Sequence, residues 1–230
     1  RLRFLGSWRF YPMTYAFLES TLDFNSYSAE SESDAASSGN LVPGSPFRIY
    51  AGLSGYVTER LSLLARVGYG NSMLDRDDNF SSFVGMLQAS WRFGPRTVLH
   101  VGVARDYDTA PLGGYVDYIR PYAAFTQRFG ELAELNIDFS YDFRSYGAWQ
   151  PTAVEVGDDT VTPVVSDRNR SEQMIRAGVL IDFDITRLLG VTIGYRYDSI
   201  ISDYSITTNG VTNFTAYDDH RLFATLNLRY

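Results

Sequence analysis

The sequence has no cysteine and no lysine among its 230 residues, so all 20 of its basic residues are arginine. Without cysteine the chain can form neither a disulfide framework nor a thiolate metal site. The formal net charge of −7 argues against a nucleic acid as the partner, because phosphate binding requires a basic surface. No stretch approaches the roughly 18 consecutive apolar residues that a transmembrane helix needs. These absences exclude a disulfide-rich domain, a helical membrane protein and a nucleic-acid-binding module.

The chain is rich in aromatic residues and shows an alternating hydrophobic pattern along its length. Aromatics make up 15% of the residues, with 17 tyrosines and 15 phenylalanines. Apolar and polar residues alternate in segments of about ten, and successive side chains of an extended strand point to opposite faces. Each segment therefore predicts a strand with one apolar and one polar face. The clearest apolar series is Ala133, Leu135, Ile137, Phe139, Tyr141 and Phe143.

The alternating segments predict eleven strands. They cover residues 1–10, 16–25, 47–57, 61–69, 83–93, 99–103, 115–129, 133–144, 175–183, 189–197 and 222–230. Short turns are expected at 11–13, 58–60, 94–96, 130–132 and 184–187. Longer polar connections are expected at 28–46, 75–79, 108–114, 146–171 and 199–217. Short turns at one end and long loops at the other are typical of outer-membrane barrels.

Aromatic residues gather at both ends of the predicted apolar face. Those beside the short turns are Trp8, Phe10, Trp91, Phe93, Phe129, Phe183 and Tyr230. A second set toward the long loops comprises Phe24, Tyr69, Phe83, Tyr141, Phe143, Tyr195 and Tyr197. Two aromatic bands that flank aliphatic residues describe the girdles of a lipid-facing surface. Because lipid leaves every backbone group to be paired internally, such strands must close into a barrel.

The segment Leu222 to Tyr230 alternates and stops on an aromatic residue. It resembles the closing strand of bacterial outer-membrane β-barrel proteins. The resemblance implies an all-β fold, a transmembrane antiparallel up-and-down β-barrel in which residues 1–230 form one domain. It also implies a location in the bacterial outer membrane, contact with outer-membrane lipid and lipopolysaccharide, and recognition of this strand by the barrel-assembly machinery.

The number of strands bears on the start of the chain. If the last of eleven strands ends in the periplasm, the first also runs toward the periplasm, which places Arg1 at the outer surface. Single-chain bacterial barrels usually have an even number of strands and a periplasmic N-terminus. We therefore expect at least one strand upstream of Arg1 and a full barrel of 12 or more. The alternatives are an odd barrel or a misread first strand.

The predicted polar faces carry many charged residues that are candidates for lining a lumen. These are Arg48, Arg66, Arg120, Arg144, Arg176, Arg196, Glu134, Asp138, Asp142 and Asp182. One interpretation is a ladder of salt bridges that satisfies these charges and stiffens the wall. The other is a charged channel that selects a polar solute or glycan.

The sequence predicts no catalytic centre, no metal site and no cofactor. His220 follows Asp218 and Asp219, but this is a local run and not a catalytic constellation, and His100 has no partner that the sequence can establish. The acidic run at 75–79 lacks the glycine and the distal glutamate of a calcium-binding loop. Arg105 is expected on the apolar face near the outer rim, where it could meet lipopolysaccharide phosphates.

The favoured functional hypothesis is a polar-lined channel or export pore for a polar solute or polysaccharide. The hairpin style, with Trp8 to Pro12 followed by acidic loops and arginine as the only base, resembles outer-membrane barrels of myxobacterial type. Some of those are linked to polysaccharide export. The alternative is a structural or adhesion barrel that acts as a non-conducting subunit of a cell-envelope complex with protein partners. An envelope enzyme ranks last.

Overall fold

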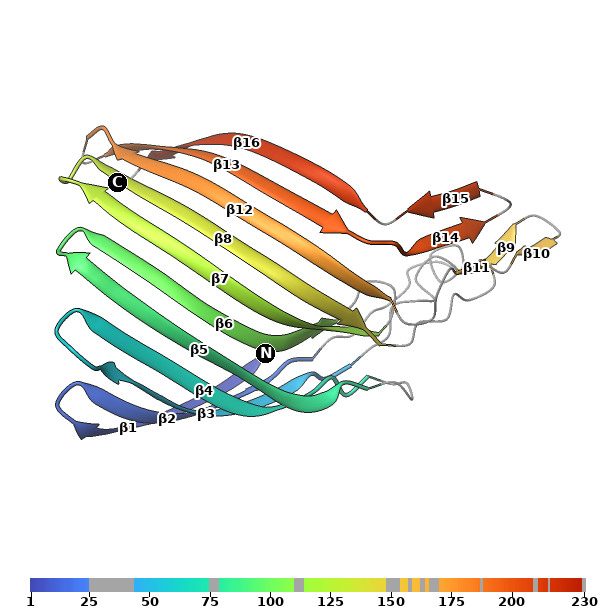
Figure 1. Ribbon diagram of the computed structural model, residues 1–230, viewed down its shortest axis with the longest axis horizontal. Coiled ribbons are helices and arrows are strands. Elements are labelled where there is room, and N and C mark those ends of the chain that lie inside the picture. Colours follow the sequence, from blue (N-terminus) through green and yellow to red (C-terminus); the bar gives the residue numbers. More distant parts are fainter. Residues whose placement is uncertain are drawn as a thin grey trace.

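The computed structural model describes residues 1–24, 44–74, 79–109, 114–147, 154–156, 159–161, 164–165, 170–186, 188–208, 211–214 and 216–228. Eleven strands form one continuous antiparallel sheet in the order β1-β2-β3-β4-β5-β6-β7-β8-β12-β13-β16 (Figure 1). Neighbours in the sheet are neighbours along the chain, apart from the short strands in the loops. The fold is therefore all-β and up-and-down, which confirms the predicted class and the predicted number of strands.

The strands of this sheet are 9 to 15 residues long. In sheet order they are β1 (Leu2–Tyr11), β2 (Thr14–Leu22), β3 (Phe47–Tyr56), β4 (Leu61–Asn71), β5 (Ser81–Gly94), β6 (Thr97–Thr109), β7 (Tyr115–Phe129), β8 (Ala133–Tyr146), β12 (Ser171–Asp184), β13 (Leu189–Ile201) and β16 (Tyr217–Leu228).

The two ends of the sheet differ, as the sequence predicts. All the tight connections lie at one end, which we call the turn end, and the longer ones lie at the other, the loop end (Figure 1). Gly130 opens the β7–β8 turn with a φ of 65°, a left-handed conformation that glycine adopts without a Cβ penalty. Among the described residues there is no helix with the length and apolarity needed to cross a bilayer.

The register assigns every strand an apolar face and a polar face. Leu53 on β3 and Val67 on β4 share one face with Leu87 on β5 and Val101 on β6, and their exposed fractions are 50–63%. A soluble protein would bury side chains of this kind, because each costs free energy in water. A contiguous exposed apolar surface over a whole sheet is instead expected of a wall that faces lipid.

The predicted aromatic bands lie on this apolar face. Exposed aromatic side chains at the turn end are Trp8, Phe10, Trp91, Phe93, Phe129 and Phe183. Exposed aromatic side chains toward the loop end include Phe24, Tyr69, Phe83, Phe143 and Tyr195. Tyr230 lies outside the described residues, and β16 ends at Leu228. The role of these residues as membrane girdles stays a prediction.

A small buried core closes the loop end over the polar faces of β3 to β6. Strand β6 pairs with β5 only up to Arg105, and its last residues pair with β7 alone. Tyr107, which is fully buried, stacks on Phe80 with ring centroids 4.3 Å apart. Its hydroxyl lies 2.9 Å from the carbonyl oxygen of Phe47 and 2.8 Å from that of Asn71. Tyr50 and Val84 complete this aromatic core.

The long connections contain short strands that the sequence does not reveal. Strands β9 (Val154–Val156) and β10 (Asp159–Val161) form a hairpin. Strands β11 (Val164–Val165), β14 (Ser205–Thr208) and β15 (Val211–Phe214) form a second small sheet. The prediction of plain loops at 146–171 and 199–217 is wrong for these residues. Strands of two to four residues are too short to produce a readable alternation.

The sheet is open, with β1 and β16 as its two edge strands. Because nine strands lie between them and every pair is antiparallel, β1 and β16 run in the same direction. Neither edge strand pairs with a second neighbour within the described part of the chain. The predicted closure and the predicted strand upstream of Arg1 stay predictions.

The assignment of the two faces can be tested with one new side chain at two adjacent positions of β12. Val179→Arg places a charge on the apolar face, whereas Leu180→Arg places it on the polar face near Asp138 and Asp182. In a lipid bilayer we expect Val179→Arg to lower the free energy of unfolding by about 2–4 kcal/mol. Leu180→Arg should change it by less than about 1 kcal/mol. Urea unfolding in liposomes, followed by heat modifiability on a gel, measures both; equal losses would contradict the assignment.

Candidate functional site

The register places all ten lumen candidates on the polar face. These are Arg48, Arg66, Arg120, Arg144, Arg176, Arg196, Glu134, Asp138, Asp142 and Asp182. The structure brings some of them together in one cluster near the loop end and leaves others apart. That this face lines a water-filled lumen stays a prediction.

Charges of alternating sign cross five neighbouring strands near the loop end, and we call this series the ion-pair belt. It consists of Arg120 on β7, Asp142 on β8, Arg176 on β12, Asp198 on β13 and Arg221 on β16. Asp142 bonds to Arg120 at 2.7 Å and to Arg176 at 2.8 Å. Asp198 lies directly opposite Arg176 in the register and bonds to Arg221 at 2.7 Å. Ion pairs thus join β7, β8 and β12, and a second ion pair joins β13 and β16, while Arg176 and Asp198 face each other across β12 and β13.

Asp142 is the centre of the belt, and its side chain is fully buried. Arg120 holds both of its oxygens, with Nε–Oδ1 at 2.7 Å and Nη2–Oδ2 at 3.0 Å. Arg144, two residues along the same strand, adds a third guanidinium at 3.3 Å. A buried carboxylate is stable only when it is fully paired. Three arginines around one aspartate therefore provide more than enough compensation and leave guanidinium donors free.

The other candidates lie in separate contacts. Arg48 bonds to Asp106 at 2.9 Å and Arg66 to Glu19 at 3.5 Å. Glu134 bonds to Arg128 near the turn end, and Asp182 accepts a hydrogen bond from Thr192. The Asp138 carboxylate packs against Gly178, and Arg196 lies opposite the same glycine in the register. Arg48, Arg66 and Glu134 are thus in local ion pairs, whereas Asp182 bonds to a hydroxyl group, and both interpretations of the charged face stay predictions.

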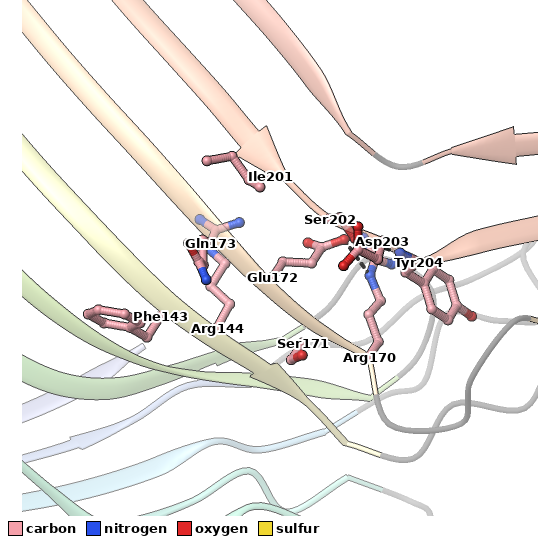
Figure 2. Close-up of a pocket in the computed structure, with 10 residues that line it drawn as sticks. All are labelled: Phe143, Arg144, Arg170, Ser171, Glu172, Gln173, Ile201, Ser202, Asp203 and Tyr204. Carbon is pink, nitrogen blue, oxygen red and sulfur yellow. Dashed lines mark hydrogen bonds and ion pairs between the residues drawn. The ribbon is translucent and has the colours of Figure 1, made fainter.

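A pocket of about 440 Å³ opens at the loop end beside the belt, and we call it the mouth pocket (Figure 2). Its polar lining includes Arg144, Arg170, Glu172, Asp203 and Tyr204. Arg170 bonds to the buried Glu172 at 2.6 Å, and its guanidinium lies over the Tyr204 ring at 5.1 Å. Burial raises the pKa of the Tyr204 phenol, so this hydroxyl is neutral and can donate a hydrogen bond at physiological pH. Balanced charges, hydroxyls and an aromatic ring suit a polar, hydroxyl-rich ligand.

The remaining candidates show no catalytic or metal-binding arrangement. His100 lies 2.8 Å from the Ser90 hydroxyl and 3.5 Å from the Gln88 amide, a polar network between β5 and β6. His220 forms a hydrogen bond of 2.8 Å with the Tyr195 hydroxyl on the apolar face. The described residues contain no group of acidic and histidine side chains arranged to hold a metal ion, and the acidic residues 75–78 lie outside them.

Arg105 lies on the apolar face at the loop end, as the alternation predicts. Its guanidinium packs over the Phe83 ring at 4.0 Å and lies 3.9 Å from Asp117. An aromatic ring and a nearby carboxylate offset the cost of a charge on an otherwise apolar surface. The contact with lipopolysaccharide stays a prediction, as does recognition of the last strand by the assembly machinery.

The belt makes Asp142 the residue on which the loop end of the polar face depends most. We expect Asp142→Asn to lower the free energy of unfolding by about 3 kcal/mol, because it leaves three guanidiniums without their shared counter-charge. Glu134→Gln is the matched control: it removes an ion pair whose arginine is largely exposed, and it should cost less than about 1 kcal/mol. Urea titration of both variants in liposomes measures the difference. Similar small losses would show that the belt adds nothing to stability.

No known protein-family model and no curated protein matches the chain. Among solved structures, the chain is similar to the outer membrane channel DcaP of Acinetobacter baumannii, with a TM-score of 0.53 and 11% sequence identity. The superposition covers 97% of this chain and 60% of that one, so this chain spans about three-fifths of the length of the channel that it matches. The likeness concerns the fold alone.

Proposed function

We propose that this chain forms the wall of a channel through the bacterial outer membrane, with the polar face toward an aqueous lumen. The observation that carries the proposal is the division of one continuous sheet into an exposed apolar face and a charged opposite face. In lipid this arrangement is favourable on both sides, because apolar side chains meet acyl chains and charges meet water. The similarity of the fold to an outer-membrane channel supports the same assignment.

The solute that we propose is polar, and a polysaccharide is the leading candidate. The mouth pocket supports this choice, because it combines two arginines, two acids and a tyrosine at the loop end, where a solute would enter or leave. Charged and amide groups can hydrogen-bond to several sugar hydroxyls at once, and the Tyr204 ring lies under the Arg170 guanidinium. The resemblance of the hairpins to barrels linked to polysaccharide export points the same way.

A structural or adhesion barrel is the second candidate, and the aromatic core favours it. Tyr50, Phe80, Val84 and Tyr107 are buried over the polar faces of β3 to β6 at the loop end. Small barrels are filled by their own side chains and conduct nothing, whereas barrels of 16–18 strands leave an aqueous channel. A filled barrel would act through its loops or as one subunit of a cell-envelope complex.

Single-channel recording in a planar bilayer distinguishes the two functions. The full-length protein should give steady current steps, and an added soluble polysaccharide should block them from the loop-end side. Heat-modifiable, correctly folded protein that carries no current would contradict the channel and support the structural barrel.

The mouth pocket can be tested in the same recording. Tyr204→Ala should weaken the polysaccharide block by about tenfold, because it removes the buried ring on which the Arg170 guanidinium lies and so loosens one donor of the pocket. Tyr11→Ala is the matched control, because Tyr11 is an exposed tyrosine at the turn end, far along the chain from this pocket. An equal loss in both variants, or none in either, would remove the pocket from the proposal.

A further inference from the structure

A second hollow lies on the polar face of β1, β2, β4 and β5, and we call it the β1–β5 hollow. It has a volume of about 380 Å³ and is lined by Leu5, Tyr15, Phe17, Leu64 and Met86, with Arg66 at its rim. Five large apolar or aromatic side chains are unexpected on a face that carries charges elsewhere. Their volume and chemistry are those of a small-molecule site, which is mostly apolar with a few placed polar groups.

The floor of this hollow is built by close packing of an aromatic ring against a glycine. The Phe17 ring lies over Gly52 on the neighbouring strand, where a Cβ atom would come within 2.4 Å of the ring. Glycine at this position lets the ring lie flat against the sheet. Phe17 is therefore held in place and presents an apolar surface to the hollow.

The charges beside the hollow are unbalanced toward the positive. Glu19 is the one carboxylate in its lining, and both Arg3 at 2.8 Å and Arg66 at 3.5 Å pair with it. The Arg66 guanidinium lies over the Tyr50 ring at 4.4 Å, which fixes its plane. Its Nε is buried and has no hydrogen-bond partner among the residues that the structure describes. The hollow thus combines an apolar floor with a net charge of about +1 and a guanidinium that has an unused donor.

We propose that the β1–β5 hollow binds an amphipathic monoanion, a carboxylate on a short aliphatic or aromatic body. The body lies on Phe17, Leu64 and Met86, and the carboxylate accepts hydrogen bonds from Arg66. This site rests on the proposed function in one respect, since the ligand reaches it through the lumen. It differs from the mouth pocket, whose charges are balanced and whose lining is polar.

Two other ligand classes fit this hollow less well. A cation would be repelled by the two guanidiniums, which outnumber the single carboxylate. A neutral sugar would set its hydroxyls against apolar side chains that cannot hydrogen-bond to them, and each unpaired polar group is costly. The excess positive charge favours the carboxylate of the proposed ligand, and the apolar floor favours its aliphatic or aromatic body.

The test uses the full-length protein in lipid nanodiscs, with binding measured by titration calorimetry, and the same protein in a planar bilayer. The probes are hexanoate and benzoate, and the controls are acetate, which lacks the body, and hexylammonium, which reverses the charge. Hexanoate and benzoate should bind at least tenfold more tightly than either control. In the bilayer they should produce brief interruptions of the current that the controls do not produce.

Three variants assign the binding to these side chains. Arg66→Gln should weaken hexanoate binding by about tenfold or more, as expected for the loss of one charge-assisted hydrogen bond. Arg66→Lys keeps the charge but loses the stacking on Tyr50, so its affinity should fall between those of the unchanged protein and of Arg66→Gln. Arg92→Gln is the matched control, because Arg92 lies on the same face and hydrogen-bonds to the Tyr56 hydroxyl at 3.4 Å, and it should leave hexanoate binding unchanged.

The outcomes separate this inference from the proposed channel. Current without selective binding of hexanoate or benzoate would overturn the inference and leave the channel intact. Selective binding that Arg66→Gln abolishes, in a protein that carries no current, would support the hollow and overturn the channel. Equal loss in Arg66→Gln and Arg92→Gln would overturn the assignment to the hollow.

Discussion

The pairing of backbone hydrogen bonds from strand to strand is the constraint on which the rest of this structure depends. Strands β2 to β13 of the sheet each pair on both sides over most of their length, so most of their amide and carbonyl groups are satisfied without water. In hydrocarbon an unpaired group costs several kcal/mol, which is why only helices and closed sheets cross membranes. The edge strands β1 and β16 are therefore the two strands whose outer backbone groups have no partner in this sheet. Both run in the same direction, so their direct pairing would be parallel, whereas an odd number of intervening strands would keep every pair antiparallel.

The alternation of side chains then gives the sheet two chemically distinct surfaces. The pleat determines which side chains lie on which surface, because a register shift of one residue would exchange the two faces of a whole strand. Leu53 lies opposite Ala65 and Val67 opposite Ala51 on one face, whereas Asp142 and Arg120 meet on the other. A chain that resided in water would gain nothing from the first pair in its exposed position. In lipid the same arrangement would be favourable on both faces, because the apolar face would contact acyl chains and the charged face would contact water.

Much of the fold could be predicted from the sequence because its signal is periodic. Eleven strands, their short turns and their faces follow from alternation, and the structure reproduces them. The short strands β9 to β11 could not be predicted, since two or three residues show no period. The aromatic core was also missed. It lies where β6 leaves β5 after Arg105. There Tyr107 contacts residues 36 and 60 positions away in the chain, and a local sequence pattern carries no signal for such contacts.

The candidate site was predicted in composition but not in arrangement. Alternation places Arg120, Asp142 and Arg176 on one face, yet only the register shows that three guanidiniums share one carboxylate. The β1–β5 hollow was missed for a different reason. Its signal is an apolar doublet, Phe17-Leu18 on β2 and Leu63-Leu64 on β4, in which both faces of the strand are apolar. Such doublets are easily taken for irregularities in an alternating pattern. Here they mark the positions where the otherwise polar face carries the apolar side chains of the hollow.

The exclusive use of arginine connects these features. On the polar face a guanidinium repeatedly lies over a tyrosine ring while it pairs with a carboxylate: Arg48 over Tyr107, Arg66 over Tyr50 and Arg120 over Tyr118. A planar guanidinium can stack with its face and hydrogen-bond with its edge at the same time, and lysine cannot do both. The rings fix the orientation of the charges, so the charged face is ordered as well as solvated. Replacing arginine by lysine at such positions would keep the charge but lose the fixed orientation of its hydrogen-bond donors.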